Sequence, residues 1–336
     1  MDSLTHIVIG ACIGEAILGK KLGKRALFLG AVAQSIPDID FIASFWLNPA
    51  NNLLAHRGFT HSFLFAILIT PFLALLSERW HRPHNISIGK WSWFFVSGML
   101  IHIFMDAFNN YGVGWFEPFS HYRVSFNVIF VADPFFSIWP GIAFIALLLL
   151  KPKIKQRIKW AGMGLVVPAC YLLLGVINKV MVDKEIKAMA VKQNISYKRY
   201  VSTPTPFNNF LWYIILEKDS GFNIGYYSVF NRNKIFNYNY FPRNDYLLEP
   251  VSNQEDLQRL RRFSQGYYTS EKWNDTIVFN DLRFGQEAGW ADPYAHFVFH
   301  YYLKKGADNK LVVQRGRFAR WNRDAFKLLI KRIRGY

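Results

Sequence analysis

The sequence predicts a mainly α-helical integral-membrane bundle of about five to six membrane helices, followed by an α+β extracytoplasmic domain. Hydrophobic residues make up 51% of the 336-residue chain, and the excess over what a soluble core needs is concentrated before Val182. After that residue, short aromatic and β-branched runs replace the long apolar ones. We therefore expect a membrane-embedded helical domain at 1–182 and a mostly β domain with a basic C-terminal helix at 183–336.

Four apolar runs have lengths near or within the about 17–25 residues that cross a bilayer. They are 60–77, 91–108, 128–150 and 160–182. Two earlier runs, 4–18 and 26–36, are shorter, and we expect a tilted pair of crossings, with a protein-shielded hairpin as the alternative. The start of the chain lacks a basic segment and an A-x-A-like cleavage site, so the first helix is expected to be retained.

Basic clusters predict the orientation of these helices. Lys20, Lys21, Lys24 and Arg25 follow the first apolar run, and five further cations lie between Lys151 and Lys159. Because an excess of Lys and Arg in short loops marks the cytoplasmic side, both clusters are expected to face inward. The chain is then a multi-pass protein of the cell (inner) membrane, and everything after Val182 is extracytoplasmic.

Imidazoles and carboxylates stand beside these apolar segments, where ionisable groups are costly without a partner or a function. The predicted topology brings seven of these residues to the outer side of the membrane, namely His6, Asp38, Asp40, His56, His61, His102 and Asp106. His102 and Asp106 are four apart on a predicted helix and share one face, as two metal ligands or as an intrahelical hydrogen-bonded pair. Because all seven residues are predicted on the same side of the membrane, a metal site built from all of them is favoured.

Nitrogen and oxygen ligands without thiolate fit zinc best, with manganese or iron as alternatives and one to three ions in the site. Cys12 and Cys170 have no ligand spacing and are expected to be core residues. An open site of this kind brings the pKa of bound water near neutrality, which predicts hydrolysis by metal-bound hydroxide. Asp38 or Asp40 is the predicted general base. Arg57 and Arg123 are predicted to clamp a phosphate, with pairing or headgroup contacts as their alternative.

Several other polar residues lie outside the predicted ligand set. Asn109, Tyr111 and Asp133 are expected to orient ligand imidazoles. Glu15 lies too deep on the first helix to share a cation with His6, so we expect it to meet a buried donor or a basic residue. His121 is expected to be a second-metal ligand or a solvated loop residue, and His296 and His300 are expected to lie on one face of a strand. Thr60 or His61 is expected to cap a helix. A capping box at 252–255 is expected to open a further helix that runs to about Phe263.

Several of these motifs resemble those of YdjM-type inner-membrane proteins, called membrane-bound metal-dependent hydrolases. The resemblance covers roughly residues 1–150. It rests on the opening 1–6, Gly14-Glu15, Gly30-Ala31, Pro37-Asp38-Ile39-Asp40, His56-Arg57-Gly58-Phe59-Thr60-His61-Ser62, the His102 to Asp106 spacing, 110–112, 118–119 and 133–134. That family is regarded as distantly similar to zinc-dependent phospholipase C and P1 nuclease, which implies a zinc-cluster hydrolase in which His102 and Asp106 match a His-x-x-x-Asp pair. A second His-x-x-x-Glu pair has no obvious match here.

The predicted function is a metal-dependent hydrolase acting on a phosphoester or related bond of a lipid-like substrate at the outer membrane face. The alternative is a non-catalytic membrane scaffold with a structural metal site; a transporter fits less well, because the polar residues gather at one face. The net charge of +17 is expected to favour membrane lipids and not nucleic acid, since no stacking platform or helix-turn-helix pattern accompanies it. From 304 to 336 the chain predicts a basic amphipathic helix on anionic headgroups, or a packed terminal helix with a solvated basic face.

Overall fold

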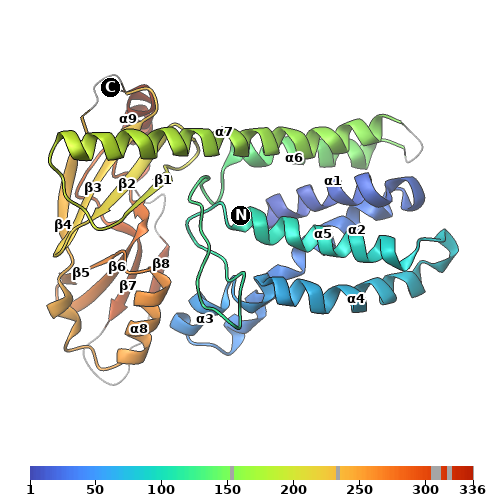
Figure 1. Ribbon diagram of the computed structural model, residues 1–336, viewed down its shortest axis with the longest axis horizontal. Coiled ribbons are helices and arrows are strands. Elements are labelled where there is room, and N and C mark those ends of the chain that lie inside the picture. Colours follow the sequence, from blue (N-terminus) through green and yellow to red (C-terminus); the bar gives the residue numbers. More distant parts are fainter. Residues whose placement is uncertain (152–154, 232–234, 304–311, 316–319, 336) are drawn as a thin grey trace. The chain divides into compact units, whose positions relative to one another are not determined.

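The computed structural model describes residues 1–151, 155–231, 235–303, 312–315 and 320–335. The chain forms two compact units. The first is helical and comprises Met1–Ala43 and Ala55–Gly175; the second contains the β-sheets and comprises Ser44–Leu54 and Val176–Tyr336 (Figure 1). Helix α7 (Gln156–Lys192) continues from the first unit into the second.

Four helices in the described part of the chain are long and apolar enough to cross a membrane. They are α1 (Ser3–Leu22), α4 (Phe63–Trp80), α5 (Ile88–Asp106) and α7 (Gln156–Lys192). Helix α2 (Arg25–Ser35) and the 3-10 helix η1 (Pro37–Phe45) pass the same test only as a pair, with a 58° bend between them. Counting that pair as one span gives up to five, at the lower end of the predicted number.

Helix α7 extends beyond the predicted run of 160–182 at both ends. The lengths of α6 and α1 also differ from the sequence prediction, and local contacts explain both. Helix α6 is only Pro134–Leu149, because Asp133 caps it and the preceding Val128 and Ile129 donate from a loop to the carbonyl of Phe108. Helix α1 is longer than the apolar run because Asp2 accepts from the Thr5 amide at 2.9 Å and the helix continues through the basic residues at its end.

Helices α1 and α2 lie side by side at very short range (Figure 1). A Cβ added at Gly14 would lie 2.0 Å from the Ala26 carbonyl oxygen, and one at Gly10 would lie 2.4 Å from that of Gly30. Only glycine permits this approach, as in other small-residue contacts between membrane helices. The crossing places Gln34, near the end of α2, next to His6 on α1.

The segment before α4 is a short turn, not the first turn of the helix. Residues Phe59–His61 form the 3-10 helix η2, and the His61 amide donates to the Gly58 carbonyl at 3.0 Å. Ser62 then caps α4 by accepting from the Phe65 amide at 3.0 Å. The predicted caps Thr60 and His61 are therefore wrong, because the 3-10 turn moves the start of the helix onward. His61 is left in the turn, with its side chain fully buried.

The second unit contains two four-stranded antiparallel sheets in which neighbours follow sequence order. The first has β1 (Tyr200–Pro204), β2 (Leu211–Glu217), β3 (Gly221–Ser228) and β4 (Tyr238–Pro242); the second has β5 (Tyr268–Trp273), β6 (Thr276–Gln286), β7 (Phe297–Leu303) and β8 (Val312–Arg315). One core joins the sheets through Tyr213, Phe222 and Phe297, and another packs the end of α7 against β2. The short helices of this unit are η4 (Asp245–Leu248), α8 (Gln254–Phe263) and nearly all of α3 (Pro49–Ala55), whereas η3 (Arg82–His84) belongs to the first unit.

The two helices predicted in this unit are present. Helix α8 ends at Phe263 as expected, but its cap is Asn253, which accepts from the Asp256 amide at 3.0 Å, so the cap lies one residue after the predicted Ser252. Helix α9 (Arg323–Ile333) packs Ala325 and Leu329 into a core of the same unit, as the packed alternative for the tail requires. Within the predicted tail, Val312–Arg315 forms strand β8 and not a helix, because it pairs with β7, and 304–311, 316–319 and 336 lie outside the described residues.

Candidate metal centre

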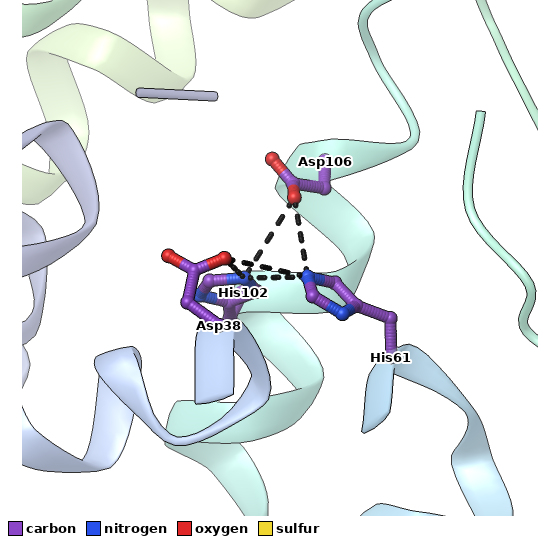
Figure 2. A group of neighbouring side chains, drawn as sticks. All are labelled: Asp38, His61, His102 and Asp106. Atoms are coloured by element: carbon purple, nitrogen blue, oxygen red, sulfur yellow. Dashed lines mark hydrogen bonds and ion pairs between the residues drawn. The ribbon is translucent and has the colours of Figure 1, made fainter. Parts of the chain in front are cut away.

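Four side chains from three separate elements converge in the first unit. Asp38 comes from η1, His61 from η2, and His102 and Asp106 from the last turns of α5. Their facing atoms, one from each residue, all lie within 4.8 Å of one another. Figure 2 shows the four side chains pointing toward one another, with His102 and Asp106 on the same helix. The predicted spacing of four residues thus puts two donors on one helix face.

The distances between these atoms describe a compact tetrahedron. The two Nε2 atoms of His61 and His102 are 3.2 Å apart. Asp38 Oδ1 is 3.6 Å from His61 Nε2 and 3.5 Å from His102 Nε2. Asp106 Oδ2 is 3.5 Å and 3.7 Å from the same two nitrogens. Four donors at about 2.0–2.2 Å from a tetrahedral zinc ion are roughly 3.3–3.6 Å apart, so the donor set fits an ion of that size.

The hydrogen bonds behind the imidazoles fix which ring atoms face the centre. His102 Nδ1 lies 2.5 Å from the Gln34 carbonyl oxygen, which can only accept, so Nδ1 carries the proton. His61 Nδ1 lies 3.2 Å from Thr60 Oγ1 and 3.4 Å from Asp40 Oδ2, and burial lowers the pKa of the His61 imidazole to about 3. In the neutral rings both Nε2 atoms therefore present lone pairs to each other and to two carboxylates. Four electron-pair donors this close repel one another unless a cation lies between them.

Asp40 stands behind His61 and connects several groups. Its Oδ2 accepts from the Arg57 amide at 2.7 Å, and its Oδ1 lies 3.2 Å from His56 Nδ1. Both oxygens face these partners, so Asp40 and His56 lie next to the four-atom group but contribute no atom to it. A carboxylate on the far nitrogen of a ligand imidazole fixes the orientation of the ring and raises its basicity. If a metal is bound by His61, Asp40 would have this positioning role.

Arg57 is a buried partner of Asp106. Its Nε lies 2.9 Å from Asp106 Oδ2, while Nη1 donates to Asn109 Oδ1 and Nη2 to the Met1 carbonyl, both at 2.9 Å. The amino group of Met1 pairs with the other oxygen of Asp106. These contacts offset the carboxylate charge and hold it in place. Phosphate binding by Arg57 stays a prediction, and the guanidinium is already bonded within the protein.

His6 lies against the group from α1. Its ring stacks on His102 with the centroids 3.7 Å apart. Its Nδ1 lies 3.3 Å from Gln34 Oε1 and its Nε2 lies 3.1 Å from Asp106 Oδ1. His6 therefore supports two members of the group but is outside the four. The sequence reasoning missed Gln34, whose signal is a polar amide side chain near the end of an apolar run.

The other predicted residues lie farther from the four atoms. Arg123 donates from Nη2 to the carbonyls of His56 at 2.8 Å and Gly112 at 3.0 Å. Tyr111 is contacted by the guanidinium groups of Arg57 and Arg123, at 5.0 and 6.0 Å from the ring centroid. These contacts brace the loops around the site. Phosphate binding by Arg123 remains a prediction.

Three further expectations have structural outcomes. Asp133 caps α6 and accepts from the Tyr171 hydroxyl at 2.9 Å, so it serves the helix. His121 is exposed and pairs with Glu117 at 2.8 Å, in agreement with a solvated loop histidine. His296 lies directly before β7 and not within it, but it and His300 both contact the Trp273 ring, so the two histidines do lie on the same side.

The expectation that Glu15 meets a buried basic residue is confirmed by Arg157. Arg157 Nε donates to Glu15 Oε1 at 2.9 Å and Nη2 donates to Oε2 at 2.5 Å, and both side chains are buried. The bidentate pair ties α1 to α7 within the first unit.

The family model described as "YdjM inner membrane protein" matches residues 1–182. The chain belongs to this family. Among curated proteins, "Inner membrane protein YbcI" of Escherichia coli (strain K12) is 33% identical over 123 residues, which are 36% of this chain and 69% of that protein. The "Uncharacterized protein YfhP" of Bacillus subtilis (strain 168) is 32% identical over 173 residues, 45% of this chain and 51% of that protein.

No solved structure matches the chain. In this YdjM-family protein the matched region contains all four residues of the tetrahedral group. The second unit, by contrast, falls largely outside the match. The distant similarity to phospholipase C remains an expectation from the resemblance.

Proposed function

We propose that this protein is an integral-membrane, metal-dependent hydrolase that acts on a phosphoester or related bond of a lipid-like substrate at the outer membrane face. The observation that carries the proposal is the tetrahedral group of Asp38, His61, His102 and Asp106. A divalent cation such as Zn²⁺ at this position would act as a Lewis acid and lower the pKa of a coordinated water. Family membership and the apolar helices support the membrane setting.

The exposure of the surrounding side chains indicates how a substrate reaches the group. The side chains of His61, His102 and Asp106 are fully buried, whereas that of Asp38 is 21% exposed. The substrate therefore approaches from the Asp38 side. Phe41 and Phe59, which lie close to Asp38 and His61 in the chain, are 61% and 45% exposed. Exposed aromatic rings beside the ligands suit a substrate with an apolar portion.

The pair of His56 and Asp40 is the proposed route for a proton. His56 is 36% exposed and its Nδ1 lies 3.2 Å from Asp40 Oδ1. The pairing orients the ring and leaves Nε2 as the atom that exchanges a proton with substrate or solvent. Asp40 thus holds both His56 and His61, one for proton transfer and one as a ligand.

The test compares the full-length protein with two histidine variants in detergent. Wild type and His121→Ala are expected to hydrolyse a member of a panel of phospholipids and phosphorylated lipids, since His121 lies in an exposed loop. His102→Ala is expected to lose both bound metal and turnover. Turnover that survives in a metal-free His102→Ala protein would contradict the proposal.

One observation favours a second candidate function, a scaffold with a structural metal. Four protein ligands in a tetrahedron are typical of structural zinc sites, whereas catalytic sites keep one position open. Under this alternative, a chelator removes the metal only as the first unit unfolds, and no lipid in the panel is cleaved. Under the hydrolase proposal, the metal exchanges while the protein stays folded.

We also propose that the chain is a multi-pass protein of the cell membrane with its C-terminal unit outside the cytoplasm. Asp219 is 91% exposed in the second unit and suits a cysteine probe. An impermeant thiol reagent is expected to label Asp219→Cys in intact cells, in a background where Cys170 is replaced because it too is exposed. Labelling only after the cells are opened would reverse the orientation.

A further inference from the structure

A second feature of the first unit lies at the other end of α1 from the candidate metal centre. It is a cleft of about 1020 Å³ formed by the end of α1, the start of α2 and the start of α7. His6 and Lys21 are fifteen positions apart on α1, which corresponds to roughly 22 Å along the helix. The cleft is therefore separate from the metal centre.

The lining of the cleft is strongly basic. It contains Lys20, Lys21, Lys24, Arg25, Lys155 and Arg157, together with the single acidic residue Glu15. Glu15 is fully engaged by Arg157 in the buried bidentate pair. The other five cations have no carboxylate partner within the lining, so the cleft has a formal charge of +5 that needs a counter-anion.

Two of these ammonium groups are held in place by the protein. Lys21 Nζ donates to the Asn85 carbonyl and Lys24 Nζ donates to the Leu148 carbonyl. An ammonium group has three donors, so each keeps protons for a ligand. Lys20, Arg25 and Lys155 form no ion pair in the described part of the chain. The positions of the anchored cations make the cleft a preformed site.

Two helix N-termini add to the positive potential. Helix α2 begins at Arg25 without a side-chain cap and without an acidic residue in its first turn. Helix α7 also begins without an acidic residue in its first turn. The N-terminal end of a helix carries a partial positive charge and attracts anions. The cations and the helix ends therefore act on the same volume.

An apolar track leaves the cleft along α2. Arg25, Phe28 and Val32 are spaced i, i+3 and i+7, so they lie on one face of the helix. Phe28 is 62% exposed and Val32 is 57% exposed. A ligand with a charged group at Arg25 can lay an apolar chain along these residues. A free phosphate would use the charges and leave the track uncovered.

We propose that this basic cleft binds the phosphate headgroup of an anionic phospholipid, with an acyl chain along Phe28 and Val32. The cleft lies at the end of α1, a helix long enough to cross a membrane, and so at headgroup depth. Basic pockets between membrane helices are a known means of holding such headgroups. This proposal does not depend on the hydrolase activity.

The test uses the full-length protein in a neutral detergent, with lipid binding counted by native mass spectrometry. Arg25→Gln combined with Lys155→Gln removes two lining cations that have no ion pair among the described residues. Arg79→Gln combined with Lys90→Gln is the matched control, because it removes the same charge at the neighbouring ends of α4 and α5, outside the cleft. Phosphatidylglycerol, phosphatidylcholine and soluble glycerol phosphate are the probes.

We expect wild type to retain phosphatidylglycerol in preference to phosphatidylcholine. The cleft variant should bind phosphatidylglycerol roughly 30-fold more weakly, as two cations near an anionic surface imply, and the control less than about 3-fold. An equal loss in both variants, or no loss in the cleft variant, would overturn the proposal. Competition by glycerol phosphate at the same concentration as the lipid would also overturn it, because the site would then recognise a free phosphate. Unchanged elution and metal content of the cleft variant confirm its fold.

Discussion

Asp40→Asn tests whether a carboxylate behind His61 tunes the metal centre. Asp40 makes three contacts, to His56 Nδ1 at 3.2 Å, His61 Nδ1 at 3.4 Å and the Arg57 amide at 2.7 Å. Asparagine keeps the shape but removes the charge, and it replaces one acceptor with a donor. Loss of such an outer partner lowers metal affinity about 10- to 100-fold, or roughly 1.4–2.7 kcal/mol.

The assay is competition for metal with a chromophoric chelator of known affinity, in detergent. Asp38→Asn, which changes a member of the four-atom group, should weaken binding more than Asp40→Asn. Asp219→Asn, at a fully solvated position of the second unit, serves as the control and should leave affinity unchanged. Unaltered affinity in Asp40→Asn would refute the positioning role, and a loss equal to that of Asp38→Asn would make Asp40 a direct ligand.

Three further outcomes follow from packing, charge and burial. Gly14→Leu should abolish metal retention, because a Cβ there would lie 2.0 Å from a carbonyl of α2, whereas Gly162→Leu, with open space around its Cβ, should retain metal. Glu15→Gln should lower the free energy of unfolding in detergent by about 3–5 kcal/mol, since it leaves the Arg157 charge buried, and replacing both residues by leucine should recover most of the loss. Burial lowers the pKa of His61 from 6.5 to about 3, so between pH 3 and pH 6.5 the unfolded chain binds a proton that the folded chain does not. The free energy of unfolding of the metal-free protein should therefore fall as the pH drops from 6.5 toward 3. His61→Gln should make this free energy depend less on pH.

The sequence predicted the helical region well where an apolar run is long and contains few charged residues. Three of the four runs predicted as firm spans, the buried partner of Glu15 and the change to β-strands all follow from hydropathy, charge and local patterning. The error in the run at 128–150 has a local cause. Hydropathy cannot distinguish the apolar loop residues Val128 and Ile129 from the helix that starts at Pro134.

The candidate site was predictable as a neighbourhood but not as a ligand set. The predicted topology put seven residues on the same side of the membrane, and the spacing of His102 and Asp106 correctly put both on one helix face. Which residues touch the centre depends on the crossing of α1 and α2 and on the 3-10 turn at His61, both of which are tertiary features. Asp40 is two residues from Asp38 yet faces the back of an imidazole, and sequence alone does not resolve that difference.

The most direct test of the account is the metal content of the purified full-length protein, measured by elemental analysis for wild type, His61→Ala, Asp106→Asn and the exposed control His121→Ala. The convergence of four donors predicts at least one divalent ion per chain in wild type and in His121→Ala, with loss in the other two variants. Wild-type protein that stays metal-free after incubation with Zn²⁺, or variants that retain the ion fully, would contradict the central claim.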